Sequence, residues 1–260
     1  MRNKALYNKL IYRLLPLVTI VLMIALWAIA AWLDGTELVF PKLSTTLKDL
    51  YGAVTQAEFW KSVGNTALRA VLSFCIAFVA AIALSLLAVK HKPFAAMFYP
   101  VVVLLRALPT ISIIFICYLS VKSWYRAVLI SFLVIFPTLY SSFYTAFKQT
   151  EGPLAEVGVV YGVKRRYVLT KYVIPSVWEY VFSDIVSILS LTVKLVVAAE
   201  AITATRNSLG GLMHRGQVNL DMGLLFAYTV VAILLAYAME LVVRLTAKIV
   251  KGASLKCRLH

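Results

Sequence analysis

Residues 70–89 read AVLSFCIAFVAAIALSLLAV, twenty residues without a charged side chain. A helix needs about 20 predominantly apolar residues to cross the hydrocarbon core of a membrane. Five further long apolar stretches lie before and after this one, and together they predict six spans at about 14–33, 62–89, 93–121, 124–147, 174–205 and 222–245. The sequence therefore predicts an all-α polytopic membrane protein with six transmembrane helices.

The composition excludes other classes of protein. The chain has 260 residues, of which 62% are hydrophobic and 14% are charged, whereas soluble domains have about 45–50% and about 25%. The same numbers exclude a disordered chain, a collagen-like fibre and a small disulfide-stapled domain. No stretch between the apolar runs is long enough for a separate domain, so we expect one transmembrane domain over residues 1–260.

Positive charge sets the expected orientation. The net charge of +15 would indicate nucleic acid in a soluble protein, but the cytoplasmic loops of membrane proteins also collect Lys and Arg. The loops on the side of the N-terminus carry sixteen Lys and Arg residues, and the opposite loops carry seven. We therefore expect both termini in the cytoplasm, contact with membrane lipid and no nucleic-acid partner.

The first span has a second interpretation. Arg2 and Lys4 precede it, and Ala28-Ile29-Ala30 resembles the cleavage site of a signal peptide. Its apolar run is longer than a usual signal core, and Trp27 and Trp32 are typical interfacial anchors. These features favour a retained span.

The fifth span carries charges that are unfavourable in lipid. Each of Asp184, Lys194 and Glu200 costs about 2.5–3.5 kcal/mol at the centre of a bilayer, which roughly cancels the gain from the apolar residues around them. One interpretation is a helix that lines a passage for a polar solute, with Arg106 of the third span as a further pathway residue. The other is structural, with the charges paired to neighbours such as Arg106.

Signals for catalysis or metal binding are absent from the sequence. The three histidines lie in different loops or in the tail, and no glycine-rich phosphate-binding loop occurs. We expect no metal, no bound cofactor and no catalytic residue in this chain.

The loop at 148–173 predicts two short helices on the cytoplasmic face. The first would end at Gly162 and would present an apolar face made of Leu154, Val157 and Tyr161. The second would run over residues 164–173, and Pro175 would break or kink the chain as it enters the membrane. An amphipathic helix on an otherwise short inner face indicates a partner, and the alternative is that it lies on lipid.

This loop resembles the EAA loop of bacterial ABC-importer permeases. In that pattern a glutamate is followed by a glycine six residues later and by a proline thirteen residues further on, as Glu156, Gly162 and Pro175 are here. Four other segments resemble the nitrate/sulfonate/taurine-type branch of these permeases: residues 59–88, 100–109 (PVVVLLRALP), 196–200 (VVAAE) and 208–212 (SLGGL). Val157 and Gly158 replace both alanines of the triplet, and Glu179 and Lys194 also depart from the usual pattern.

The resemblance implies a type I ABC-importer permease fold with a cytoplasmic coupling helix, in a bacterial inner membrane. It implies a second permease copy, giving a homodimer, two ATP-binding subunits that hold ATP–Mg, and an extracytoplasmic substrate-binding protein. The expected ATPase-coupling residues are Leu154, Glu156, Val157, Tyr161, Gly162 and Pro175. The expected solute is a nitrate-, sulfonate- or taurine-like anion or a vitamin precursor.

Two other classes of function stay open. A self-sufficient secondary transporter or channel would need no ATPase, but such carriers often show two related halves, and none is evident. A membrane enzyme would need a catalytic site that the sequence does not offer.

Overall fold

The computed structural model describes residues 2–37, 39–150, 161, 163 and 165–256, and every regular element among them is a helix. In chain order these are α1 (Arg2–Asp34), α2 (Leu43–Val54), α3 (Ala57–Lys90), α4 (Lys92–Ala107), α5 (Thr110–Ser120), α6 (Ser123–Thr150), α8 (Arg165–Val168), the π-helical turn η1 (Leu169–Val173), α9 (Ile174–Ile202), α10 (Leu209–Val218) and α11 (Met222–Lys256). This confirms the all-α fold class.

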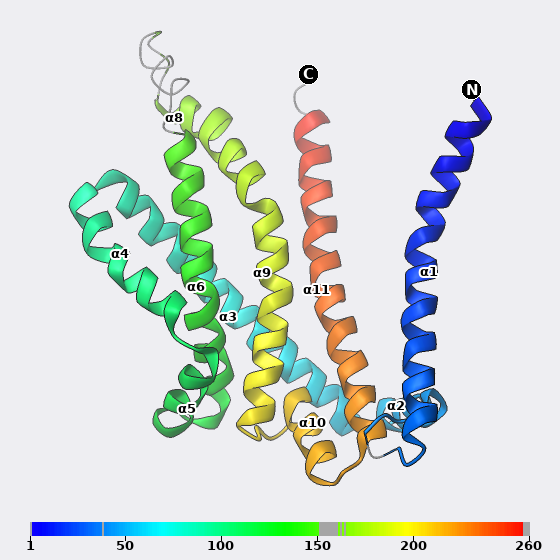
Figure 1. Cartoon of the computed structure of the whole chain (residues 1–260). Helices are drawn as coiled ribbons and strands as arrows, with labels where there is room; N and C mark the ends of the chain where they lie inside the picture. Colours follow the sequence, from blue (N-terminus) through cyan, green and yellow to red (C-terminus); the bar gives the residue numbers. More distant parts are fainter. Residues whose placement is uncertain (1, 38, 151–160, 162, 164, 257–260) are drawn as a thin grey trace.

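The long helices run alternately between two ends of the molecule (Figure 1). Five stretches of helix in the described residues are long and apolar enough to cross a membrane, and α4 with α5 makes a sixth if the pair is taken as one span. The start of α1 and the end of α11 lie at the same end of the bundle, and α8 lies there too (Figure 1). The short helices α2, α5 and α10 lie at the opposite end.

The third apolar stretch is bent sharply. We expected one span over 93–121, but α4 and α5 meet at an angle of 96°. Leu108 and Pro109 between them have extended backbone, with ψ of 126° and 131°. A proline disfavours helical geometry in the residue before it, so the helix ends at Ala107 and restarts after Pro109.

We expected a break or a kink at Pro175, and the break does not occur. The chain stays helical from Arg165 to Ile202, and Pro175 lies in the first turn of α9. The turn before it is π-helical, so the N–H of Ile174 donates to the carbonyl of Leu169, five residues earlier. A wider turn relieves the clash between a proline ring and the preceding turn of an α-helix. The helix therefore absorbs Pro175 without ending.

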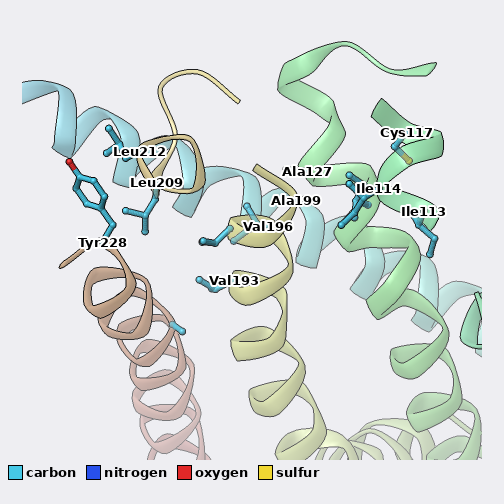
Figure 2. Packing of buried hydrophobic residues seen from close by; sticks show 14 of the residues in the cluster. Ile113, Ile114, Cys117, Ala127, Val193, Val196, Ala199, Leu209, Leu212 and Tyr228 are labelled. Carbon is cyan, nitrogen blue, oxygen red and sulfur yellow. The ribbon is translucent and has the colours of Figure 1, made fainter. Parts of the chain in front are cut away.

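Small residues let α3 pack closely where it crosses the bundle obliquely (Figure 1). Its buried face repeats alanine and serine, which allow helix backbones to approach within a membrane: Ser62, Ala70, Ser73, Ala77, Ala81, Ser85 and Ala88. Figure 2 shows part of one apolar cluster, in which buried side chains of α2 and α3 pack with those of α5, α6, α9, α10 and α11. This cluster fixes the corner between α9 and α10.

Two segments that we expected as loops contain helices. Residues 34–61 include α2 and the start of α3, and residues 206–221 include α10. By contrast, α1 stands apart from the other helices (Figure 1). Near its end the Trp27 ring lies 5.5 Å from that of Phe226 on α11, and its Nε1–H donates to the carbonyl of Pro41 at 3.1 Å.

Candidate functional site

A buried ion pair joins the end of α9 to α3. Glu200 has no exposed surface, and its Oε1 lies 2.6 Å from Nη1 of Arg69, which is 2% exposed. The second carboxylate oxygen accepts hydrogen bonds from the Thr66 hydroxyl at 2.8 Å and from the Gly210 N–H at 3.2 Å. The Arg69 guanidinium also lies 5.6 Å from the centre of the Trp124 ring, close enough for a cation–π contact.

This cluster ties three helices together. Thr66 of α3 donates to Glu200 of α9 and accepts from the N–H of Leu209 at 2.9 Å, at the start of α10. In a low-dielectric interior, removing one partner of such a pair destabilises a protein by about 3–5 kcal/mol because the other charge is left uncompensated. The ion pair is therefore a structural lock on the α9–α10 corner.

The backbone at this corner is held in an uncommon conformation. Ala204 and Asn207 have left-handed backbone, with φ of 47° and 49°, which residues with a side chain seldom adopt. The amide of Asn65 donates to the Asn207 carbonyl at 2.9 Å, and the N–H of Thr205 donates to the Glu200 carbonyl at 2.9 Å. These contacts from α3 and α9 fix the course of the loop.

The glycines after the corner are required by close packing. A Cβ on Gly210 would collide with the Val197 carbonyl and the Glu200 side chain, and one on Gly211 would collide with the Thr205 carbonyl. Ser208 caps the helix, since its hydroxyl accepts the Gly211 N–H at 3.0 Å. The stretch SLGGL is thus a cap followed by two positions where only glycine fits.

A polar stripe runs along the exposed face of α9. Between Tyr180 and Ala198 the exposed side chains follow one face of the helix, and they are Tyr180, Ser183, Asp184, Ser187, Leu191, Lys194 and Ala198. The opposite face is buried and apolar apart from Thr192 and Glu200. On α11 the exposed side chains in the middle of the helix are apolar, among them Ile233, Leu234 and Leu241. We name the α9 set from Ser183 to Lys194 the polar stripe.

The three remaining candidate pathway residues are all exposed in the chain. The hydroxyl of Ser142 on α6 donates to Asp184 at 2.7 Å. Lys194 forms no hydrogen bond or ion pair with any described residue. Arg106 lies at the end of α4, and its Nη2 reaches the Pro137 carbonyl at 3.4 Å, so it pairs with neither Glu200 nor Asp184.

Most of the expected coupling residues fall outside the described residues. This holds for Leu154, Glu156, Val157 and Gly162. Tyr161 is 80% exposed, and Pro175 is exposed in the first turn of α9. The helix that follows the loop, α8, lies at the end of the bundle where α1 starts (Figure 1).

Sequence reasoning missed the partner of Glu200. Arg69 lies within the expected span 62–89 and was not singled out, although a charge of opposite sign in a neighbouring apolar span is the signal that points to such a pair. The two residues are 131 positions apart, so no local pattern links them. Thr66, one turn before Arg69, is part of the same polar face of α3.

Comparison with known proteins identifies the family. Residues 73–252 match the family model of the binding-protein-dependent transport system inner membrane component. A comparison with curated proteins finds none that matches. Because the match covers more than half of the chain, the protein belongs to this family, and it is a multi-pass permease subunit of an ABC transporter.

Proposed function

We propose that this chain forms the translocation pathway of an ABC importer for a small solute, and that a separate subunit hydrolyses ATP–Mg to drive it. The main evidence for a pathway is the polar stripe on α9. A lysine and an aspartate exposed on a membrane-spanning helix are each unfavourable against lipid by about 2.5–3.5 kcal/mol near its centre. Facing water or a second copy of the chain removes that penalty.

The rest of the assembly follows from the same proposal. The stripe lies on the open side of a single chain, so a second permease copy, an identical one in a homodimer, closes the passage. Asp184 and Lys194 line it, Arg106 stands at its side, and the Arg69–Glu200 pair holds the helix corner near its end. An extracytoplasmic binding protein delivers the solute, which we expect among nitrate-, sulfonate- or taurine-like anions and vitamin precursors.

The ATPase acts at the other end of the bundle, where α8 lies. We infer that the loop 148–173 contacts the ATPase through Leu154, Glu156, Val157, Tyr161 and Gly162, and that Pro175 sets the start of α9. The support is threefold: family membership, the expected amphipathic helix and the continuity of α8, η1 and α9. A push on the loop is then transmitted along an unbroken helix to the polar stripe. The bias of Lys and Arg toward this end supports a cytoplasmic position for both termini.

Thiol accessibility tests the pathway. In a cysteine-free chain reconstituted with its ATPase, Ser187→Cys places a thiol in the polar stripe, and Leu234→Cys places one on an exposed apolar face of α11. A membrane-impermeant, water-soluble maleimide should label the first position and spare the second. Equal protection of both thiols would place the stripe against lipid or protein and contradict a passage there.

A further inference from the structure

A pocket opens beside the corner between α9 and α10. Its volume is about 340 Å³, and its walls are the loop 204–207, one face of α10 and Glu58 at the start of α3. It belongs to the end of the molecule where α2, α5 and α10 lie (Figure 1). It is separate from the polar stripe, which ends at Lys194.

Two arginines and one glutamate are the charged side chains of the lining. Arg206 is exposed and forms no hydrogen bond or ion pair with any described residue, and Arg215 lies in the pocket wall on α10. Arg215 Nη2 lies 2.7 Å from Glu58 Oε1, but both side chains are more than half exposed. An exposed pair of this kind contributes little, about 0–1 kcal/mol, and a guanidinium has five N–H donors. Arg215 therefore keeps donors for a ligand.

The N-terminus of α10 does not supply the attraction. The first N–H groups of α10 are already used, because Leu209 donates to Thr66, Gly210 to Glu200 and Gly211 to Ser208. The N-terminus of α10 is therefore not available to an anion in the pocket, and the arginine side chains are its charged donors.

The backbone on both sides of Arg206 is held in a fixed conformation. The left-handed residues Ala204 and Asn207 stand close to it on both sides in the chain. Strained backbone of this kind persists where the surroundings impose it and occurs often at ligand sites. Here the surroundings are the Asn65 contact and the buried lock on Glu200.

We propose that this pocket binds a small oxyanion, a carboxylate or sulfonate group, between the guanidinium groups of Arg206 and Arg215. The planar fork of an arginine matches the two oxygens of such a group. The volume is at the lower end of the range for small-molecule sites, about 300–1,000 Å³. The group belongs either to a free small acid or to an acidic side chain of a protein that docks at this end.

Charged thiol reagents test the site on the purified full-length permease, without ATPase turnover or a known solute. In a background with Cys75, Cys117 and Cys257 replaced, Glu58→Cys or His214→Cys places a thiol in the pocket wall. Val218→Cys, 66% exposed on the same helix, is the control outside it. The measured quantity is the ratio of the modification rates by a sulfonate-bearing and by an ammonium-bearing methanethiosulfonate.

Arg206→Gln should lower this ratio about tenfold, because in water a unit charge about 6 Å away changes the local concentration of each monovalent ion about threefold, in opposite directions. Lys122→Gln removes a charge from the loop between α5 and α6 and should leave the ratio unchanged. Either thiol reporter suffices, so misfolding of one variant leaves the test intact.

Protection experiments separate the two sources of the anion. Protection by acetate, but not by acetamide at matched ionic strength, supports a free small acid. Protection only by a glutamate-rich peptide supports an acidic side chain of a docking protein. A ratio that Arg206→Gln does not change, or no protection by either anion, overturns the proposal.

Discussion

Removing one charge of the Arg69–Glu200 pair should destabilise the bundle strongly. Glu200→Gln keeps the size of the side chain and an oxygen that can accept from Thr66 and Gly210, but it leaves the charge of Arg69 uncompensated at 2% exposure. Two unit charges about 4 Å apart interact by about 4 kcal/mol at an effective dielectric constant of 20. Measured losses for broken buried pairs are similar, about 3–5 kcal/mol. We expect Glu200→Gln and Arg69→Met each to lower the free energy of unfolding by this amount.

A paired replacement shows whether the loss comes from the uncompensated charge. The double variant Arg69→Met with Glu200→Leu removes both charges together, and such replacements are often neutral or stabilising. It should therefore recover most of the stability that either single variant loses. Arg106→Met is the matched control, since Arg106 is exposed and makes one long hydrogen bond at 3.4 Å, and it should change little.

Unfolding by SDS in mixed micelles, followed by tryptophan fluorescence, measures these differences. Trp124, which lies beside Arg69, reports the site directly. A Glu200→Gln variant as stable as the wild type would show that the charge of Arg69 needs no partner. A double variant no more stable than the less stable single variant would contradict the role of the uncompensated charge as well.

Three further predictions concern the loop, the stripe and the opposite end. Gly162→Val and Glu156→Lys should keep expression but abolish transport or ATPase association, measured by uptake and co-purification; normal uptake in both would remove the loop as the contact. Lys194→Met should leave thermal stability unchanged yet weaken uptake of an anionic solute at least several-fold. A loss of several kcal/mol of folding stability, with uptake unchanged, would indicate a structural role instead. Burial and the nearby charge of Asp221 raise the pKa of Asp49 on α2. The folded chain therefore binds the Asp49 proton more tightly than the unfolded chain does. This proton binding stabilises the fold at low pH, and the stabilisation is lost as the pH rises through the raised pKa. Asp49→Asn should therefore raise Tm at pH 7 and flatten the fall in Tm as the pH rises above the ordinary range of an aspartate, and an unchanged pH profile would contradict the assignment.

The sequence was most informative where apolar length decides the structure. A charge-free run such as 70–89 has few alternatives to a spanning helix, whereas the stretch 93–121, expected as one span, is divided at Pro109 into α4 and α5. The bend angle of 96° depends on packing against α6 and could not be read from composition. The π-helical turn before Pro175 is likewise a local adjustment. Both a break and a widened turn accommodate a proline, which has no N–H to donate, so the sequence does not decide between them.

The candidate site was predictable only in part. Charges in the fifth span indicated a helix that cannot lie wholly in lipid, and the structure divides them between two settings. Lys194 and Asp184 are exposed, while Glu200 is buried against Arg69. Which charge faces inward follows from the rotation of α9 in the bundle, and the helical spacing between Glu200 and Lys194 alone does not fix that rotation.

Co-purification with an ATPase is the decisive test of an ATP-driven permease. The full-length chain, expressed in its native host with an affinity tag, should retain a subunit that binds ATP through a phosphate-binding loop. Reconstituted with that subunit, it should take up solute only when ATP is hydrolysed. Uptake by the purified chain alone, driven by an ion gradient and indifferent to ATP, would contradict the account and identify a secondary transporter.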